Sequence, residues 1–331
     1  MISLKLYTRE WGNRYISTRP GETKLGENIQ YVSDLSELSQ SSAKFVIFGI
    51  PEDIGVRANY GKAGTANAWR SFLYAFLNVQ QNHYLNPEEL ILLGEINTSE
   101  ALAKASNIET SDPNYHEKLG DLTAMIDKVV RDTVREIVAA GKIPLIIGGG
   151  HNNAYGNLSG ASEALQQPVN ALNIDAHTDL RKTDYRHSGN GFSYALKNGF
   201  LGRYYVYGLH QNYTPEYIFD NLKTSEELAF RLLEDLPLND RTGLFSEAIH
   251  FVNREPFGLE LDCDAIANFP SSAVSPSGFT LEEARELLRK AAGEKNCLYL
   301  HICEAIEAPG FPTGKALSYL ITDFIKHKKY D

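Results

Sequence analysis

The chain carries the stretch Val-Asn-Ala-Leu-Asn-Ile-Asp-Ala-His-Thr-Asp at residues 169–179. Its first six residues are mostly apolar and predict a buried strand. Asp175, His177 and Asp179 follow at alternating positions as that strand ends, and alternate residues of an extended chain share one face. Three ionisable groups on one face need costly desolvation unless a cation compensates them. The stretch therefore predicts a metal site, with a solvated strand-end loop as the alternative.

Seven further β-rich runs lie outside this strand, at 44–50, 89–93, 143–147, 204–207, 248–252, 258–261 and 298–302. Amphipathic helical patterns alternate with them, most clearly at 115–140, 280–292 and 315–326. This alternation predicts a three-layer α/β/α fold, whose mostly parallel central sheet of about eight strands has helices on both faces. Ligands of such sheets bind beyond the carboxyl ends of the strands.

No repeat or Pro/Gly/Ser-rich linker divides the chain, so we interpret residues 1–331 as one domain with an N-terminal extension at 1–43. Residues 212–256 are the least regular part. We expect a helical patch near 225–233, a polar turn at 239–241, and an excursion of this segment over the site.

Composition excludes several classes of function. A formal net charge of -10 argues against a general nucleic-acid surface, which needs clustered Lys and Arg. No apolar run approaches the roughly 20 residues that span a bilayer, and no signal peptide is evident. Cys263, Cys297 and Cys303 have no CxxC spacing, and two of them lie in apolar runs, so a reducing, cytoplasmic setting fits best.

Two further clusters follow predicted strands. Three glycines at 148–150 lead into His151, a turn that could also cradle a phosphate, although no GxGxxG and no Lys-Ser/Thr pair is present. Asp262 and Asp264 stand two apart at another strand end, where an exposed acidic edge is the alternative. Glu260 shares their alternation but is expected deeper along the strand.

Together the clusters supply two imidazoles and four carboxylates at one rim of the sheet. Hard oxygen and imidazole nitrogen ligands, with no thiolate needed, suit Mn(II) better than a structural zinc site. Carboxylates can bridge two cations, and such a pair can acidify one shared water.

With these clusters the sequence resembles the ureohydrolase superfamily of arginases, agmatinases and formiminoglutamases. Gly-Gly-Gly-His at 148–151 resembles its first motif, Asp-Ala-His-Thr-Asp at 175–179 its DAHxD motif, and Asp-Cys-Asp at 262–264 its DxD motif. The likeness also includes 48–53 and 59–64 and reaches Glu304, so it covers most of the chain from about residue 45.

The resemblance implies an arginase-like fold and two manganese ions per chain. The ligands would be His151 and Asp179 for one ion, His177 and Asp264 for the other, and Asp175 and Asp262 for both. Glu304 matches the acid that steadies amidine or guanidine nitrogens, with a peripheral surface acid as its alternative. Asp179 would also relay the proton during catalysis.

Within the superfamily the closest likeness is to formiminoglutamase, because Ala154 and Gly156 follow the first motif as in that branch. Arg181 supports the same choice, since a guanidinium beside the metal rim suits a substrate with two carboxylates and would repel cationic arginine or agmatine. A structural pair of Arg181 with Asp184 is the alternative.

The loop at 186–192 resembles the family's specificity loop, which makes His187, Ser188 and Asn190 candidate substrate-binding residues. It lacks the His-Gly-Pro run of arginases and agmatinases, and it also departs from the Ser-Gly-Thr-Pro-Phe usual in formiminoglutamases. His187 and His210 are candidate proton carriers, with surface histidines as the alternative.

The resemblance implies a small-molecule hydrolase that converts N-formimidoyl-L-glutamate into L-glutamate and formamide. Alternatives are a guanidine hydrolase of the arginase or agmatinase type that releases urea, and a metal-free binding or scaffold relative. No nucleic-acid or membrane partner is expected, and a homo-oligomer is left open because the family commonly assembles.

Overall fold

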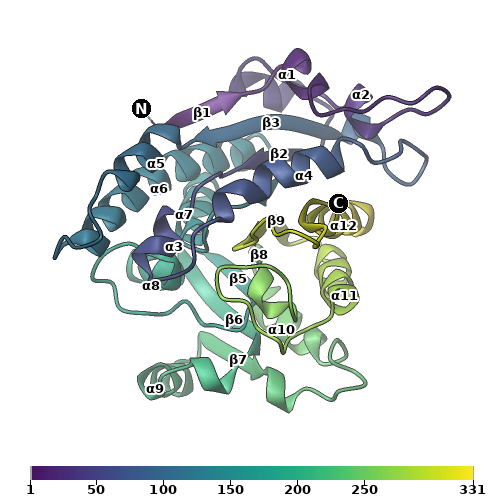
Figure 1. Ribbon diagram of the computed structural model, residues 1–331. Coiled ribbons are helices and arrows are strands. Elements are labelled where there is room, and N and C mark those ends of the chain that lie inside the picture. The colour runs from purple at the N-terminus through teal and green to yellow at the C-terminus, as the bar shows by residue number, and fades with distance from the viewer. Residues whose placement is uncertain (1, 331) are drawn as a thin grey trace.

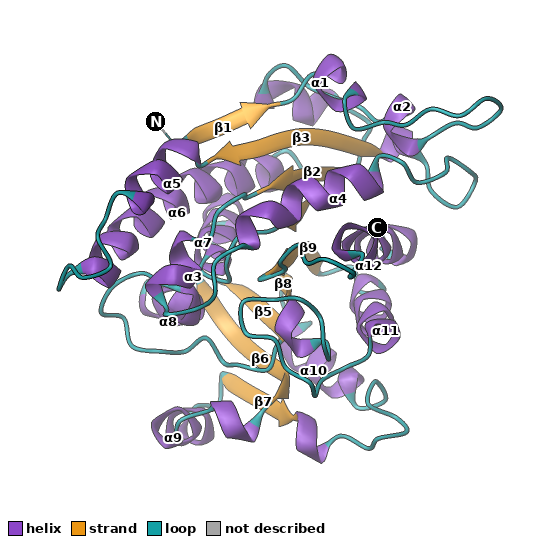
Figure 2. Cartoon of the chain, viewed as in Figure 1, coloured by secondary structure: helices purple, strands orange, loops and turns teal. Residues whose placement is uncertain are grey.

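A nine-stranded sheet runs through residues 2–330, the part of the chain that the computed structural model describes (Figures 1 and 2). The strands are β1 (Ser3–Leu6), β2 (Phe45–Gly49), β3 (Leu90–Asn97), β4 (Ile143–Ile147), β5 (Val169–Ile174), β6 (Leu201–Leu209), β7 (Leu228–Leu232), β8 (Phe257–Asp262) and β9 (Cys297–Cys303). Their order across the sheet is β1-β3-β2-β4-β9-β8-β5-β6-β7, and every neighbouring pair is parallel except β1 with β3. The predicted parallel α/β sheet is confirmed, with nine strands instead of about eight.

Helices cover both faces of the sheet. They are α1 (Arg9–Asn13), α2 (Leu25–Asn28), α3 (Ile54–Ala58), α4 (Ala68–Phe76), α5 (Ser99–Ser106), α6 (Tyr115–Ala139), α7 (Asn153–Leu165), α8 (Gly191–Lys197), α9 (Glu216–Thr224), α10 (Phe245–Val252), α11 (Leu281–Ala292) and α12 (Thr313–His327). One hydrophobic core lies under α4, α10, α11 and α12, and a second lies under α3, α5, α6, α7, α8 and α9. No helix within residues 2–330 is both long and apolar enough to cross a membrane.

Strand β2 shows why a sheet forms here with two buried faces. Its five residues are all buried, and successive side chains alternate between the two cores: Phe45 and Ile47 join the first, Val46 and Phe48 the second. A strand of this kind needs apolar residues at every position, and each large apolar side chain contributes about 1.5–3 kcal/mol on burial.

Two predicted elements are wrong. The expected strand at 248–252 is helix α10, which buries Phe245, Ala248, Ile249 and Val252 at helical spacing. A short apolar run cannot be assigned to strand or helix from periodicity alone. The expected helical patch at 225–233 contains strand β7, which pairs with β6 at one edge of the sheet.

The N-terminal extension at 1–43 and the segment at 212–256, expected as an excursion over the site, each contribute a strand to the sheet. Strand β1, within the N-terminal stretch, forms the opposite edge of the sheet through its antiparallel pairing with β3. Within 212–256, β7 extends the sheet and α10 packs against it, while Tyr213, Pro215 and Ile218 reach a cavity at the carboxyl edge.

The strand order places the candidate residues at one edge of the sheet. Strands β4, β9, β8 and β5 are consecutive neighbours and parallel, so their carboxyl ends lie side by side. His151 follows β4, Glu304 follows β9, Asp262 ends β8, and Asp175 follows β5. Residues more than 150 positions apart in sequence therefore meet there.

Candidate metal centre

His151 is the centre of a first group of potential metal ligands. Its Nδ1 lies 2.9 Å from Asp179 Oδ2, 3.2 Å from Asp175 Oδ2 and 3.4 Å from Asp262 Oδ2. The His151 side chain is buried, and neither ring nitrogen has a hydrogen-bond partner among the described residues. One imidazole nitrogen surrounded by three carboxylates is a donor set that a cation could fill.

A second group lies beside the first and shares Asp175. His177 Nδ1 is 2.9 Å from Asp264 Oδ2 and 3.6 Å from Asp175 Oδ1. In each group the potential ligand atoms lie within 4.8 Å of one another. All six predicted ligands thus belong to two adjoining groups, which could hold two cations with Asp175 between them.

Backbone hydrogen bonds fix the two acidic turns. Asp175 Oδ1 accepts from the backbone N–H of His177 at 2.6 Å, and Asp262 Oδ1 accepts from that of Asp264 at 2.8 Å. A short carboxylate that caps the residue two positions on forms a tight turn, which explains the D-x-H and D-x-D spacing. Asp179 has a φ of 49°, a left-handed conformation that L-residues rarely adopt and that concentrates at functional sites.

The electrostatics of the cluster show a shortage of positive charge. Burial raises the pKa of Asp262 well above its usual range, and the neighbouring charges of Asp264 and Asp175 raise it further. Burial and the charge of Asp175 likewise raise the pKa of Asp179. For Asp175 burial also acts upward, but contacts with the two histidines outweigh it and hold the pKa well below its usual range. The carboxylates therefore compete for two imidazoles, and bound cations would relieve that competition.

The glycine-rich turn before His151 is held by Glu52, which sequence reasoning missed. This fully buried carboxylate accepts from Gly150 N at 2.9 Å and from Asn153 Nδ2 at 2.8 Å. Gly149 has a φ of 72°, and a Cβ there would lie 2.7 Å from a Glu52 oxygen. The Pro-Glu-Asp sequence at 51–53 was part of the family likeness and was the available signal for Glu52.

Glu304 closes the cluster from the side of β9. It is buried, so the alternative of a peripheral surface acid is wrong, and its Oε1 accepts from His151 N at 2.7 Å. Its Oε2 has no partner among the described residues. Burial is the main cause that raises the pKa of Glu304 to about 8.

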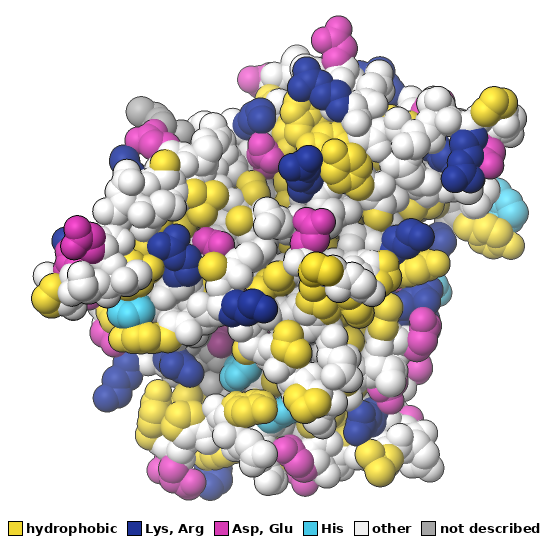
Figure 3. Space-filling model, in the orientation of Figure 1, with side chains coloured by type: hydrophobic (Ala, Val, Ile, Leu, Met, Phe, Trp, Pro, Cys, Tyr) yellow, Lys and Arg dark blue, Asp and Glu magenta, His cyan; other side chains and the backbone are white. Residues whose placement is uncertain are grey.

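A cavity of about 440 Å³ opens directly over the cluster. Its floor carries His177, Asp179, Asp262, Asp264 and Glu304, and its walls include Asn59, Lys62, Arg181, Ser188 and Tyr213. On the face shown in Figure 3, acidic, basic and histidine side chains gather around a hollow near the centre. Asn59, Lys62 and Tyr213 were not predicted as site residues, although Asn59 and Lys62 lie in the 59–64 motif.

Of the four predicted substrate-binding residues, two reach this cavity. Arg181 and Ser188 line it, and Asn59 Nδ2 donates to Ser188 Oγ at 3.1 Å. His187 and Asn190 are not brought to it. His187 Nδ1 accepts from Gly189 N at 3.1 Å, and Asn190 donates to two backbone carbonyls, so both residues hold the loop in shape.

The two candidate proton carriers, His187 and His210, are both buried, and they differ in their distance from the ligand groups: only His210 lies beside a residue that contacts one of the potential ligands. Burial lowers the pKa of His187 to about 4, which leaves this ring neutral. His210 is buried beside Tyr213, which also stacks on His177 with ring centroids 5.5 Å apart. Neither histidine is an exposed surface residue, so that alternative is wrong for both.

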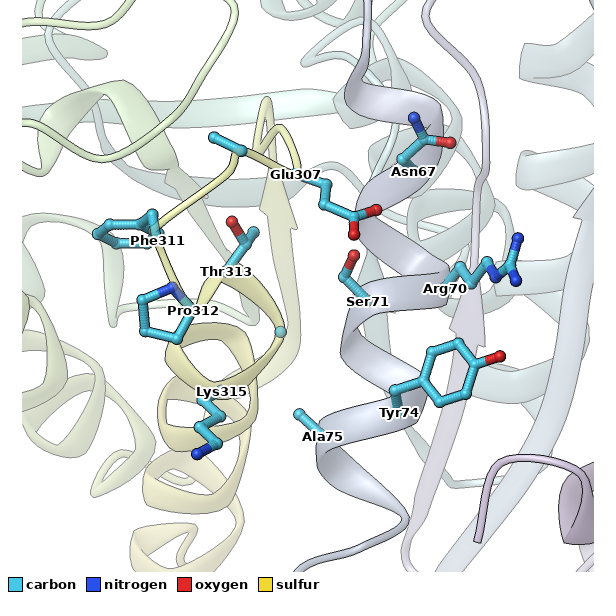
Figure 4. Close-up of a pocket in the computed structure, with 12 residues that line it drawn as sticks. Asn67, Arg70, Ser71, Tyr74, Ala75, Glu307, Phe311, Pro312, Thr313 and Lys315 are labelled. Atoms are coloured by element: carbon cyan, nitrogen blue, oxygen red, sulfur yellow. The ribbon is translucent and has the colours of Figure 1, made fainter. Parts of the chain in front are cut away.

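A second, larger cavity lies elsewhere, between α4 and the start of α12. It measures about 750 Å³ and is lined by Arg70, Ser71, Tyr74, Glu307 and Lys315 among others (Figure 4). None of the groups of potential metal ligands found in residues 2–330 lies there. The chemistry of the described residues therefore favours the smaller cavity.

The Arginase family model matches residues 43–310, and the chain belongs to this family. It is similar to the formimidoylglutamase of Chromobacterium violaceum, with 27% identity over 248 residues that cover 72% of each chain. It is also similar to the formimidoylglutamase of Macrococcus caseolyticus, with 26% identity over 78% of this chain and 76% of that one.

Solved structures show the same fold. The formimidoylglutamase of Bacillus subtilis superposes with a TM-score of 0.75 at 16% identity, over 94% of this chain and 93% of that one. The formiminoglutamase of Trypanosoma cruzi, solved with Mn2+, superposes with a TM-score of 0.72 at 18% identity, over 93% of this chain and all of the other.

Proposed function

We propose that the chain is a binuclear-manganese hydrolase that converts N-formimidoyl-L-glutamate and water into L-glutamate and formamide. The observation that carries the proposal is the pair of ligand groups joined by Asp175 on the floor of a cavity with Arg181 in its wall. The curated relatives named formimidoylglutamase support this choice of substrate.

The residues present fit two manganese ions. His151 is buried with both ring nitrogens unpartnered among the described residues, a costly arrangement that metal ligation would relieve. Carboxylate oxygens dominate both groups, and Mn(II) accepts such hard ligands together with imidazole. The related T. cruzi enzyme was solved with Mn2+, which supports the same metal here.

The ions, when bound, would supply Lewis-acid activation of water and of the substrate's C=N group. Glu304 would orient the amidine, because the unpartnered Oε2 can accept an N–H from it. Asp179 would take the proton released as water adds to the C=N carbon and would pass it to the leaving nitrogen. The C–N bond to the amino group of glutamate then breaks, and the oxygen stays in formamide.

The walls of the cavity suit an anionic substrate tail. Arg181 makes no ion pair with another described residue, and Asp184 lies against His187 instead, which disfavours the structural Arg181–Asp184 pair. Lys62, Asn59 and Ser188 line the same wall. These donors match two carboxylates far better than a guanidinium or an ammonium group.

A substrate panel with manganese-loaded protein tests the proposal. Formamide and urea would be measured by NMR during incubation with N-formimidoyl-L-glutamate, L-arginine and agmatine, with a chelator-stripped sample as the control. We expect formamide from the first substrate and no urea from the others. Urea release alone would replace the proposed activity with that of a guanidine hydrolase. Protein with well under one manganese per chain and no turnover would identify a metal-free relative.

A further inference from the structure

A buried carboxylate, Glu260, lies beneath the candidate metal centre and takes no part in the proposed chemistry. It stands on β8 opposite His301 of β9, and both side chains are fully buried. Glu260 Oε2 lies 2.5 Å from His301 Nδ1, and Oε1 accepts from the Tyr299 hydroxyl at 2.7 Å. Each carboxylate oxygen is thus occupied from β9, which fixes the orientation of the group.

The partners of Glu260 are themselves fixed. His301 Nδ1 donates to Glu260, because a carboxylate can only accept, and the Nε2 of the same ring lies 3.3 Å from the carbonyl oxygen of Gly148. The ring of Tyr299 lies where a Cβ at Gly258 would be, 2.1 Å from its Cζ, so the glycine makes room for it. The arrangement connects β8, β9 and the turn that carries His151.

The two ring nitrogens of His151 face different carboxylates. Nδ1 faces the aspartates of the metal cluster, and Nε2 lies 3.6 Å from Glu260 Oε2. That distance is slightly too long for a hydrogen bond, and Nε2 has no other partner among the described residues. A metal-ligating histidine generally donates its other N–H to such an acceptor, which fixes its tautomer and orientation.

We infer that Glu260, whose Oε2 is held by His301, is a positioning residue that accepts the Nε2–H of His151 and thereby directs Nδ1 to one of the two metal ions. The inference rests on the proposed function only in assuming that His151 ligates a metal. A third ion bound by His151, His301 and Cys303 is the competing arrangement, because these residues also form a ligand-like group.

Glu260→Gln tests this role, because it keeps the size of the side chain and removes the charge. Tyr299→Phe is the matched control, since it removes a hydrogen bond to the other oxygen and leaves Oε2 in place. Mn2+ affinity and stoichiometry would be measured by electron paramagnetic resonance titration. We expect Glu260→Gln to weaken one of the two sites about 10–100-fold and to leave the other unchanged. Tyr299→Phe should change neither site by more than a few-fold.

A spectroscopic measurement separates positioning from general stability. Zinc-loaded, ¹⁵N-labelled protein should show a slowly exchanging imidazole N–H on Nε2 of His151, retained in Tyr299→Phe and lost or shifted in Glu260→Gln. Unchanged affinity and an unchanged N–H signal in Glu260→Gln would overturn the inference, as would three ions per wild-type chain. If Glu260→Gln does not fold, the wild-type signal decides, because a rapidly exchanging Nε2 proton rules out the buried acceptor.

The outcome is distinguishable from the fate of the proposed function. Protein that binds two ions but hydrolyses no amidine contradicts the function and leaves the role of Glu260 intact. If the protein is active and Glu260→Gln leaves the Mn2+ affinity of both sites unchanged, only the positioning role is contradicted. Wild-type protein that binds no ion contradicts both.

Discussion

At the scale of single residues, Asp175 is the most connected group in the cluster. One of its oxygens faces each histidine, so both ligand groups depend on it. Asp175→Asn keeps the shape and removes the charge. Loss of an outer-shell partner typically costs 10–100-fold in metal affinity, so loss of a shared ligand should cost at least about 100-fold.

Metal analysis and turnover measurements after dialysis against limiting manganese check this expectation. Asp184→Asn is the control, because its side chain is 59% exposed and lies outside the cluster. An Asp175→Asn protein that keeps two ions and full turnover would show that the cluster is not the metal centre.

Arg181 is predicted to act on substrate affinity. Charge-assisted hydrogen bonds contribute about 1.5–3 kcal/mol, so Arg181→Ala should raise KM for N-formimidoyl-L-glutamate roughly 10–100-fold with a smaller change in kcat. Arg254→Ala is the control, because this exposed arginine precedes β8 at the amino-terminal edge of the sheet. Steady-state kinetics measure both. Formamidine has no carboxylate. If Arg181→Ala lowered kcat/KM equally for formamidine and for N-formimidoyl-L-glutamate, Arg181 would not bind the carboxylates of the substrate.

The candidate ligands could be predicted from sequence because ionisable residues directly follow buried strands that end at one edge of the sheet. Asp175, His177 and Asp179 do come together, but through a turn and the positive φ of Asp179 and not through the extended chain that their alternation predicted. The direction of loop side chains has no such periodicity, which is why His187 and Asn190 were expected in the cavity. Tyr213 was missed for the same reason, since no local pattern marks a residue that reaches the site from a distant loop.

At the scale of elements, the turn between β4 and α7 depends on Gly149. Gly149→Ala and Gly141→Ala both place a side chain at a positive φ, 72° and 71°, which costs about 1–2 kcal/mol. Only at Gly149 would the new Cβ collide, at 2.2 Å from Asn153 Nδ2, whereas nothing lies within 4 Å at Gly141. We therefore expect both variants to lose stability, and only Gly149→Ala to lose manganese affinity.

Denaturant unfolding and manganese titration of the two variants check this pair. Equal manganese affinity in both would mean that the Glu52-held turn does not position His151.

The specificity loop is anchored by a buried ion pair. Arg186 Nε lies 2.8 Å from Asp127 Oδ2 on α6, and the guanidinium sits between the rings of Tyr155 and Tyr194. Arg186→Met leaves a buried, unpaired carboxylate and should cost about 3–5 kcal/mol of unfolding free energy. Adding Asp127→Leu should recover much of that loss. A double-mutant cycle by denaturant unfolding measures the coupling free energy between Arg186 and Asp127.

The same pair predicts a dependence on pH. Burial raises the pKa of Asp127, and Arg186 opposes that rise. Without Arg186 the folded-state pKa rises further above the unfolded value, so the folded state binds more protons and stability increases as pH falls through that window. The loss of unfolding free energy caused by Arg186→Met should therefore be smaller at acidic pH. A deficit that grows on acidification would contradict this account.

Element assignment from sequence succeeded where the pattern was long and failed where it was short. Helix α6 spans 25 residues and was predicted almost to its last residue. Helix α10 and strand β7 are short apolar segments in which both periodicities are compatible with the residues present, and tertiary contacts decide between them. The four-residue strand β1 is half exposed and carries almost no signal.

At the scale of the whole molecule, manganese should stabilise the fold. Four carboxylates and two histidines crowd the junction of β4, β5, β8 and β9, so a ligand bound there holds the middle of the sheet together. Saturation at 100 times Kd adds about 2.7 kcal/mol. We expect Tm to rise by several degrees with Mn2+ and to fall again with chelator, by differential scanning calorimetry.

Mg2+ is the control for that measurement, because it prefers oxygen ligands and retains several of its waters. It should raise Tm less than Mn2+ at the same concentration. A Tm that is indifferent to both ions would contradict a metal centre in the folded protein.

The position of β9 in the sheet affects the order in which the chain can fold during synthesis. This strand is the last along the chain, yet it lies between β4 and β8 in the middle of the sheet. A nascent chain on the ribosome can pair β2 with β4 and β5 with β8 early, but the two halves stay unjoined until residues 297–303 emerge. Contacts that span such long loops form slowly. Emergence of β9, rather than any earlier step, therefore sets the moment at which the residues after β4 can meet those after β5 and β8 in the candidate metal centre.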